Sequence, residues 1–434
     1  MSYSAIVCKI FVRPVPGLDN LVLGSCLGYN VLVSKSTKDG DLGCYFESGG
    51  QLSDEFCKAN NLYRVKDADG KDIGGMFEEN RRVKCIKLRG VKSEGFWIPI
   101  QSLAFTGHPI DGLKEGDSFN MFGDVPICCK YETPSQRKGG GNQSVGIKVR
   151  KNNPMFPRWI ETEAFKKFGG NIPAGSYIML SEKVHGTSQR TAMVLDPVPN
   201  TGWRKVAEKV LGWFNVKFME EKEWVKLNGT RNTVVEKRIY PGFHGEEGFR
   251  LTCGNMFTPR KGEIFFYEIV GYTEGGAPIM ATQDTSVLKS KAFTKKYGDT
   301  MVYKYGNPEG ECSVYVYNIA TVNEDGQIVN YSWPQVVARC RELGLNTVPV
   351  LEPPFIYDGD YPALQARVNA LVEGPNLDEV MMSTIDPFTV REGVVVRYES
   401  DQGFGWLKQK SYAFFAMEGI LRDDNAYVDR EEVS

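Results

Sequence analysis

Charged residues stand inside strand-like apolar runs in the second half of the chain, and this limits the folds open to it. Glu268 lies in the aromatic and β-branched run 264–271. A carboxylate there is costly to bury unless a cation, a metal or a sugar hydroxyl binds it. Glu392 comes just before three consecutive valines, and Lys408 and Lys410 share one face of a further strand by the period of two. We therefore expect strands that carry acids and lysines at their edges.

A lysine that could act as a nucleophile lies in the tetrapeptide Lys183-Val184-His185-Gly186. An amine attacks a phosphate only in its neutral form, so such a lysine must be partly desolvated or stand beside cations and a metal that lower its pKa. Gly186 would let the backbone approach a bound nucleotide closely. The tetrapeptide alone is also typical of a surface lysine beside a hairpin turn. Its interpretation therefore depends on the residues that follow it along the chain.

Two more candidates follow. Arg231 belongs to the sequence GTRN, and Tyr317 to the run 314–319, whose aromatic and β-branched residues predict a strand. Each has a plain alternative, because Arg231 could be an exposed residue of a glycine-bounded turn and Tyr317 a packed residue of a strand. Glu392 has a weaker alternative, since packing alone would favour another valine at its position.

Taken in order, these motifs resemble those of the covalent nucleotidyltransferase superfamily, which contains the ATP-dependent DNA and RNA ligases and the mRNA capping guanylyltransferases. The resemblance covers residues 181–415. It implies the following roles: Lys183 accepts the nucleotide, Arg231 is the arginine that follows it, Glu268 holds the ribose, Tyr317 stacks on the base, Glu392 lies near the metal, and Lys408 and Lys410 contact the phosphates.

The residues around Lys183 complete the nucleotide-binding set that the resemblance implies: Glu182, Val184, His185 and Gly186. His185 stands where many ligases carry an aspartate, although RNA ligases that resemble this chain also use histidine there. Its near-neutral pKa and lack of a fixed charge make it a poor holder of metal-bound water. We therefore place the metal on Glu392, and whether His185 contacts metal-bound water stays open at this point.

The chain is expected to fold as an α+β protein in which a nucleotidyltransferase domain follows an all-β domain. Strand-like runs separated by glycine and aspartate turns predict a barrel of the oligonucleotide-binding (OB) type over residues 1–125. Three consecutive glycines and an excess of basic residues predict a flexible basic linker over 126–150. The nucleotidyltransferase domain is expected over 151–420, followed by an acidic tail over 421–434.

Helices are expected at three places in the second domain. Apolar residues at helical spacing predict an amphipathic helix over 203–227. Shorter helices are predicted over 334–343 and 362–372, each with a proline at its start.

A basic segment lies in the predicted barrel. Residues 81–92 contain six basic residues and no acid, alternating with apolar ones as in a strand with a basic outer face. Such a strand could be a solvated edge that resists aggregation. Beside a ligase domain, a contact with nucleic acid is about as good an explanation, and Lys84, Lys87 and Arg89 are then the candidates for RNA binding.

Composition limits the partners and the cellular compartment that we expect for this protein. A formal net charge of -2 excludes a globally basic binder of polyanions, so any contact with nucleic acid must come from local patches. No apolar stretch is long enough to span a bilayer, and no signal-peptide pattern opens the chain. Ten cysteines without a CxxC pair, beside only three histidines, argue against a zinc site and for reduced thiols. We expect a soluble, intracellular and most simply cytoplasmic protein.

The 434-residue chain ends soon after Lys410, so no downstream OB domain of the kind found in DNA ligases and capping enzymes is expected. A barrel placed before the nucleotidyltransferase domain is similar to nick-sealing RNA ligases. This resemblance implies ATP, which leaves AMP covalently on Lys183, with Mg²⁺ or Mn²⁺ as cofactor. The implied partner is RNA with 3′-hydroxyl and 5′-phosphate ends, typically a nicked duplex, in RNA repair. No membrane and no protein partner are predicted.

Two alternatives remain open. A capping guanylyltransferase would use the same lysine with GTP, and a catalytically silent ligase-like protein would bind RNA without joining it. The chain keeps all the charged residues of the motifs, which argues against the silent protein.

Overall fold

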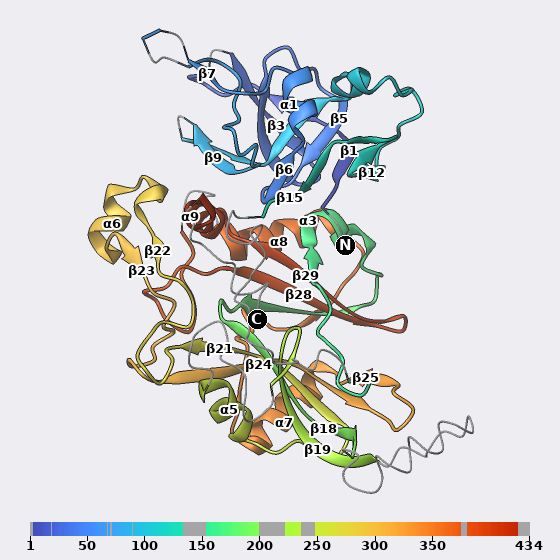
Figure 1. Ribbon diagram of the computed structural model, residues 1–434, viewed down its shortest axis with the longest axis vertical. Helices are drawn as coiled ribbons and strands as arrows, with labels where there is room; N and C mark the ends of the chain where they lie inside the picture. Colours follow the sequence, from blue (N-terminus) through green and yellow to red (C-terminus); the bar gives the residue numbers. More distant parts are fainter. Residues whose placement is uncertain are drawn as a thin grey trace, which may run out of the picture.

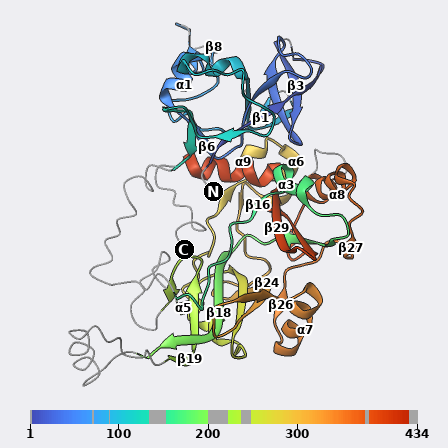
Figure 2. The ribbon, with the colours of Figure 1, turned by 90° about the vertical axis from the view of Figure 1, so that its right-hand side faces the viewer.

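The computed structural model has an α+β architecture in which strands predominate (Figure 1). It describes residues 3–18, 20–66, 68–69, 72–88, 90–132, 153–198, 222–235, 248–374 and 380–423. The described residues form an N-terminal region, 3–132, and a C-terminal region, 153–423. Figures 1 and 2 show the N-terminal region at one end of an elongated molecule, above helix α9 (Tyr412–Asp423) of the C-terminal region.

Small sheets make up the N-terminal region. The largest has the strand order β11-β5-β1-β12, and a second has the order β2-β3-β4. Their strands are β1 (Ala5–Lys9), β2 (Phe11–Arg13), β3 (Leu21–Cys26), β4 (Tyr29–Ser34), β5 (Leu42–Phe46), β11 (Phe96–Pro99) and β12 (Ser118–Phe119). Paired short strands complete the region: β6 (Gly50–Leu52) with β15 (Cys128–Lys130), β7 (Val65–Lys66) with β8 (Asp72–Gly74), β9 (Cys85–Leu88) with β10 (Val91–Glu94), and β13 (Met121–Phe122) with β14 (Val125–Pro126).

Helical turns interrupt this region, so the expectation of an all-β segment was wrong in detail. Helix α1 (Asp54–Ala59) forms because the Ser53 side chain accepts a hydrogen bond from the Phe56 backbone, which caps the helix at its start. The helix buries Phe56 and Cys57 in the core of the region. A 3₁₀ helix, η1 (Ile100–Thr106), follows β11.

The boundaries of two predicted segments differ in the structure. β15 pairs with β6, so the part of the predicted linker up to Lys130 belongs to the N-terminal sheets, whereas 133–150 lies outside the described residues. The basic segment 81–92 was predicted as one strand. In the structure it leads into a hairpin of β9 and β10, since Gly90 has a φ of 84°, which permits a tight turn.

Two sheets form the C-terminal region. The five-stranded sheet has the order β16-β29-β28-β17-β27, with strands β16 (Glu163–Ala164), β17 (Tyr177–Lys183), β27 (Phe355–Ile356), β28 (Gly393–Ser400) and β29 (Gly403–Lys410). The seven-stranded sheet has the order β20-β19-β18-β21-β24-β25, with β26 also on β24. Its strands are β18 (Thr187–Pro197), β19 (Lys222–Thr230), β20 (Val234–Val235), β21 (Glu263–Gly271), β24 (Cys312–Val322), β25 (Ile328–Asn330) and β26 (Asn346–Thr347).

Helices cover these sheets. They are α3 (Phe165–Phe168), η2 (Gly169–Asn171), α5 (Gly248–Asn255), α7 (Trp333–Leu343), α8 (Tyr361–Glu373) and α9 (Tyr412–Asp423). An insertion before β24 contains β22 (Gln283–Asp284), η3 (Ser286–Leu288), α6 (Lys291–Tyr297) and β23 (Thr300–Met301).

The strand period gives the five-stranded sheet two different faces. One buries Leu180, Val394 and Val396 against Leu364 and Val368 of α8, and the other faces the seven-stranded sheet.

Two of the three predicted helices are confirmed. α7 begins with a capping box between Ser332 and Gln335, and α8 begins where Asp360 accepts from the Ala363 backbone. The predicted helix over 203–227 is wrong in its last part, because 222–227 lies in β19 and pairs with β18. That long antiparallel pairing overrides the helical spacing. The rest of this prediction, 203–221, lies outside the described residues.

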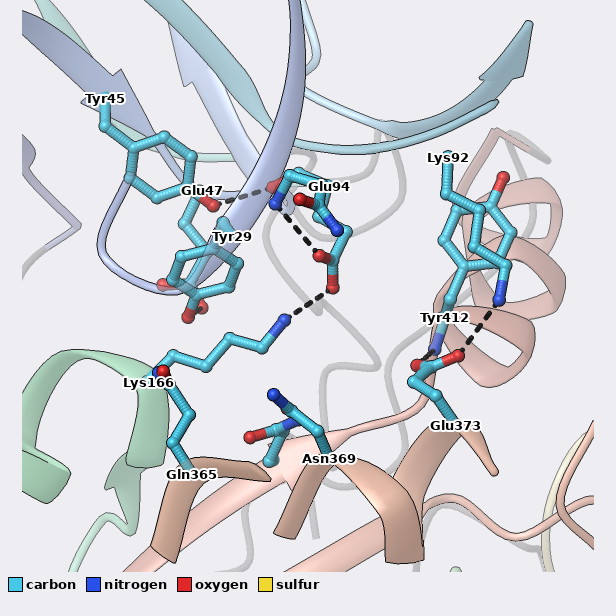
Figure 3. A network of polar contacts seen from close by, with 12 residues as sticks. Tyr29, Tyr45, Glu47, Lys92, Glu94, Lys166, Gln365, Asn369, Glu373 and Tyr412 are labelled. Carbon is cyan, nitrogen blue, oxygen red and sulfur yellow. Dashed lines mark hydrogen bonds and ion pairs between the residues drawn. The ribbon is translucent and has the colours of Figure 1, made fainter. Parts of the chain in front are cut away.

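Ion pairs join the two regions. Lys166 Nζ of α3 lies 2.8 Å from Glu94 Oε1 of β10, and Lys92 Nζ lies 3.1 Å from Glu373 Oε2 of α8 (Figure 3). Lys167 makes a similar pair with Glu47. All six side chains are at most one-quarter exposed, so water screens these pairs less than ordinary surface pairs. We call this set of contacts the seam.

None of the helices in the described ranges is both long and apolar enough to cross a bilayer.

Candidate functional site

The predicted nucleophile lies where the chain passes from one sheet to the other. β17 of the five-stranded sheet ends at Lys183, and β18 of the seven-stranded sheet begins at Thr187. Between them, Gly186 lies so close to β21 that an added Cβ would stand 2.5 Å from the carbonyl oxygen of Ile269. The crossover therefore requires this glycine for strand packing, a reason distinct from the predicted approach to a nucleotide.

Two predicted lysines face each other across β28. In the strand register Lys183 pairs with Gly393, and Gly393 pairs with Lys410. Because Gly393 has no side chain, the central strand places nothing between the two lysines. Glu392 directs its carboxylate to both: Oε2 lies 2.9 Å from Lys183 Nζ, and Oε1 lies 2.9 Å from Lys410 Nζ. The acid and the two lysines form one cluster, which we call the charged cluster.

The charged cluster is almost closed to solvent. The Glu392 side chain is 0% exposed, and the side chains of Lys183 and Lys410 are 16% and 11% exposed. A carboxylate removed from water needs such counter-charges, because its desolvation alone costs several kcal/mol. The cluster therefore explains why a glutamate stands at the start of a valine-rich strand.

His185 belongs to the same cluster. Its Nδ1 lies 3.4 Å from Glu392 Oε2, and its ring packs edge-on against Tyr303 and Phe414, with centroids 4.6 and 4.8 Å apart. The His185 backbone N–H donates to the Tyr305 hydroxyl over 2.8 Å. Burial, and after it the nearby Glu182 carboxylate, raises the pKa of Tyr305, which keeps this phenol neutral. These contacts fix the histidine beside the acid.

A cavity opens between the facing surfaces of the two sheets, next to the charged cluster. Seven residues predicted from the sequence line it: Glu182, Lys183, Val184, Arg231, Glu268, Tyr317 and Lys408. Glu392, Lys410 and His185 gather at one end of it, where Lys183 joins the cavity to the charged cluster. The structure thus divides the predicted set into a cavity wall and a charged end.

Part of the polar lining of the cavity comes from the seven-stranded sheet. Ser188 pairs in register with Glu268, and its hydroxyl lies 3.0 Å from the Tyr317 hydroxyl. Burial, and next the Glu268 carboxylate, raises the pKa of Tyr317. The phenol is therefore neutral and can exchange a hydrogen bond with Ser188, while its ring faces other aromatic side chains.

Two tryptophans that the sequence interpretation missed complete the cavity. The Trp159 ring centroid lies 5.0 Å from that of Tyr317, 4.9 Å from that of Phe266 and 4.8 Å from that of Trp406. Trp406 stands two residues before Lys408 on β29, so the period of two could have found it. Trp159 lies in an irregular segment before β16, where no periodic signal marks it.

Arg397 was also missed, and it connects the two sheets at the cavity. Its guanidinium donates to Asn318 Oδ1 of β24 over 2.9 Å and to Glu399 Oε1 over 2.8 Å. The side chain is only 1% exposed, and this burial lowers the pKa of Arg397. An arginine so placed holds the cavity walls at a fixed separation.

Glu182 is engaged on the side away from the charged cluster. Its Oε2 accepts from the Thr384 backbone N–H over 2.8 Å and from the Thr384 hydroxyl over 2.7 Å. Arg391 Nε lies 3.8 Å from the same oxygen. The acid next to the predicted nucleophile therefore anchors the segment that leads to Glu392.

The candidates for RNA binding lie in the N-terminal region, away from the cavity. Lys84 pairs with Glu78 over 3.4 Å, Lys87 is exposed on β9, and Arg89 lies outside the described residues. Two other basic residues of segment 81–92 turn inward. Lys92 belongs to the seam, and Arg82 donates to the Gly419 carbonyl of α9 over 2.6 Å. The segment is therefore only partly a solvated basic face.

Within the described residues, histidine, cysteine, aspartate and glutamate side chains form no group of three that could hold a metal by themselves. A divalent ion at this site would need further oxygen ligands, from water or from a substrate.

Comparison with known proteins gives a structural likeness without a sequence match. No protein-family sequence profile and no curated protein sequence matches the chain. Solved structures of Naegleria gruberi RNA ligase share the fold. A variant with ATP and Mn is 12% identical, with a TM-score of 0.56 over 95% of this chain and 98% of the ligase. A variant with AMP and Mn is 14% identical, with a TM-score of 0.57 over 95% and 97%. The ligase with PPi is 15% identical, with a TM-score of 0.56 over 94% and 97%.

Proposed function

We propose that this protein is an ATP-dependent RNA ligase that joins RNA 3′-hydroxyl and 5′-phosphate ends. The charged cluster of Lys183, Glu392 and Lys410, placed at the end of a cavity, is the observation that carries the proposal. A fold shared over nearly the whole chain with an RNA ligase supports it. In this proposal the OB-like domain predicted over 1–125 extends to Lys130, where β15 pairs with β6, and the rest of 126–150 is a linker. The nucleotidyltransferase domain predicted over 151–420 extends to the end of α9 at Asp423, and the rest of 421–434 is an acidic tail.

ATP occupies the cavity in this proposal. The base lies among the aromatic rings at Tyr317, and the ribose lies near Glu268 and Arg231, which share the cavity wall. The phosphates lie at the end where Lys183 and Lys408 line the cavity and where Lys410 joins the charged cluster. Flat rings suit a nucleobase and lysines suit phosphates, which supports this placement of the nucleotide.

Mg²⁺ or Mn²⁺ fits the charged end. Glu392 provides a buried carboxylate there, and protein sites for Mg²⁺ usually combine one or two carboxylates with the phosphates of the substrate. Glu392 would hold the ion together with the phosphate oxygens of ATP. The metal would supply positive charge that stabilises the charge developing on the phosphates.

Three transfers follow for the residues of this chain. Lys183 Nζ, as the neutral amine, attacks the α-phosphorus of ATP; a nitrogen–phosphorus bond forms, the bond to pyrophosphate breaks, and Nζ loses a proton to solvent. An oxygen of the RNA 5′-phosphate then attacks the phosphorus of the AMP; a phosphorus–oxygen bond forms, the bond to Lys183 Nζ breaks, and Nζ takes up a proton from solvent. The RNA 3′-hydroxyl finally attacks that activated phosphate, loses its proton and displaces AMP. Lys408 and Lys410 stabilise negative charge on the phosphates in these transfers.

The proposed substrate is a nicked duplex with RNA on the 3′-hydroxyl side. The formal net charge of -2 means that duplex binding must depend on local basic surfaces, such as the exposed Lys87 of β9. Phosphate contacts of this kind make binding sensitive to salt.

Incubation with α-labelled ATP or GTP and a divalent metal, followed by denaturing electrophoresis, tests the proposal. We expect ATP to label the protein and GTP not to. A nicked RNA duplex should then be sealed by the labelled protein without further ATP. Labelling by GTP alone would indicate a capping enzyme instead, and RNA binding without labelling by either nucleotide would indicate a silent ligase-like protein.

A further inference from the structure

A group of unpaired lysines lies on the insertion between β22 and β23. Lys289, Lys291, Lys295 and Lys296 are all exposed, and none makes an ion pair or side-chain hydrogen bond with a described residue. Lys296 Nζ only lies over the ring of its neighbour Tyr297, 4.9 Å from the centroid. The chain as a whole carries a net charge of -2, so these four lysines form a local positive region on a slightly negative protein.

Acidic residues of the insertion do not cancel this charge. Residues 283–301 contain only two acids, Asp284 and Asp299. Asp284 accepts from the Ser286 backbone and so serves the turn into η3. The surface that remains is a short helix, α6, with lysines on its exposed side. We call it the α6 basic surface.

The α6 basic surface is attached to the element that follows the charged cluster. Phe293 and Met301 of the insertion pack with Ala413 and Met417 of α9 in one apolar cluster. α9 begins two residues after Lys410, and its Phe414 packs on the His185 ring. Figures 1 and 2 both show α6 beside α9 and below the N-terminal region. The lysines therefore have a fixed relation to the charged end of the cavity.

In the proposed function, RNA is the second substrate, and the side of the site next to α9 is left for it. In that proposal ATP fills the cavity, with its base at Tyr317 and its phosphates at Lys183. In this inference a nucleic-acid end meets the phosphates at the charged end of the cavity, which α9 flanks through Phe414. The β9–β10 hairpin also packs against α9 there, which places its basic residues and those of α6 along the same helix.

We propose that the α6 basic surface binds the phosphate backbone of the RNA substrate next to the joint. This inference rests on the proposed function and deepens it. Lysine ammonium groups are point charges that suit phosphates in any sequence, so the surface positions the strand without reading its bases. Binding releases counterions from the RNA and therefore weakens as salt rises.

The test compares two double variants of equal charge. Lys291→Gln with Lys295→Gln removes two charges from α6. Lys9→Gln with Lys114→Gln removes two exposed charges from β1 and from the segment before β12, on the opposite side of the molecule in Figure 1. The affinity for a fluorescent nicked RNA duplex is measured from low to moderate salt, with covalent labelling by ATP and thermal unfolding as controls.

The α6 variant is expected to make the negative slope of log affinity against log salt shallower by about 1.5, because each lost phosphate contact removes about 0.7 to 0.9 from its magnitude. The control variant should leave the slope unchanged, and both should label with ATP like the original protein. Equal slopes for all three proteins would overturn the inference while leaving the proposed function intact. Absence of ATP labelling in the original protein would instead defeat the proposed function. The inference would also be overturned if the whole protein bound phosphatidylserine vesicles through the α6 basic surface but did not bind RNA there.

Discussion

Lys183 Nζ lies 2.9 Å from Oε2 of Glu392, and the carboxylate in this pair is completely buried. The other oxygen of the same carboxylate holds Lys410 at the same distance. One acid therefore sets the positions of two cations that belong to different strands. Changes at Glu392 should affect both lysines, whereas a change at either lysine leaves the other pair in place.

Replacing Glu392 by glutamine should lower the rate of covalent labelling by ATP by about 10² to 10³, the usual effect of losing one preorganised charged group. Stability should fall by about 2 kcal/mol, because two mostly buried lysines lose a charged partner. Single-turnover labelling and urea unfolding measure the two effects. Glu418→Gln is the matched control, since Glu418 lies 3.7 Å from Lys410 but belongs to α9. An equal loss of labelling in the control would contradict a special role of Glu392.

Replacing Lys183 should separate its charge from its nucleophilicity. Lys183→Ala is expected to abolish labelling, because among the described residues Lys183 both lines the cavity and pairs with Glu392, whereas Lys408 only lines the cavity and Lys410 only pairs with Glu392. Lys183→Arg keeps a cation that can pair with Glu392 but cannot form the covalent bond, so it should unfold near the temperature of the original protein and remain unlabelled. Labelled Lys183→Ala would move the nucleophile to another residue.

Strand periodicity predicted much of this site from the sequence. The run around Glu268 became β21, and the segment of Lys408 and Lys410 became β29, in which the period of two places both lysines on one face. Period cannot tell which neighbours a side chain meets. Lys408 and Lys410 share a face, yet Lys408 lines the cavity while Lys410 reaches Glu392.

Other features depend on contacts between distant segments and have no local signal. The Trp159 ring gains its position from Tyr317 and Trp406, which follow it by more than half of the C-terminal region. The segment before residue 227 read as helical, but its end pairs with β18. Lys92 looked like a solvated residue of a basic strand, although it meets Glu373 from a different region of the chain. Tertiary pairing decides each of these cases.

Trp159→Ala should raise the ATP concentration needed for half-maximal labelling by about 3- to 10-fold. The reason is that the ring lies 5.0 Å from Tyr317 in the cavity wall, and such aromatic contacts contribute about 0.5 to 1.5 kcal/mol. Trp159→Phe keeps an aromatic ring and should change the value less. The ATP dependence of the labelling rate checks both. An unchanged dependence for the alanine variant would place the base away from Trp159.

The Lys92–Glu373 pair of the seam should contribute more to stability than an ordinary surface pair. Its side chains are 20% and 13% exposed, whereas those of Lys9 and Glu115, 3.8 Å apart, are both 53% exposed. Glutamine at position 373 can still accept from the Tyr412 backbone, so Glu373→Gln isolates the ion pair. Double-mutant cycles from urea unfolding should give a coupling of about 1 kcal/mol at the seam and near zero for Lys9 and Glu115. Equal couplings would show that the seam is no more than surface contact.

Charge reversal at Lys84, Lys87 and Arg89 should weaken nick sealing while covalent labelling by ATP continues. ATP is small and is proposed to bind within the C-terminal region, whereas a duplex needs phosphate contacts over a longer path. Lys92→Glu provides the contrast, because Lys92 is turned into the seam and its reversal should lower stability before it alters RNA binding. Sealing measured against salt, beside thermal unfolding, distinguishes the two variants. If the triple variant seals nicks with unchanged affinity and salt dependence, the outer part of segment 81–92 is a solvated edge that holds no RNA.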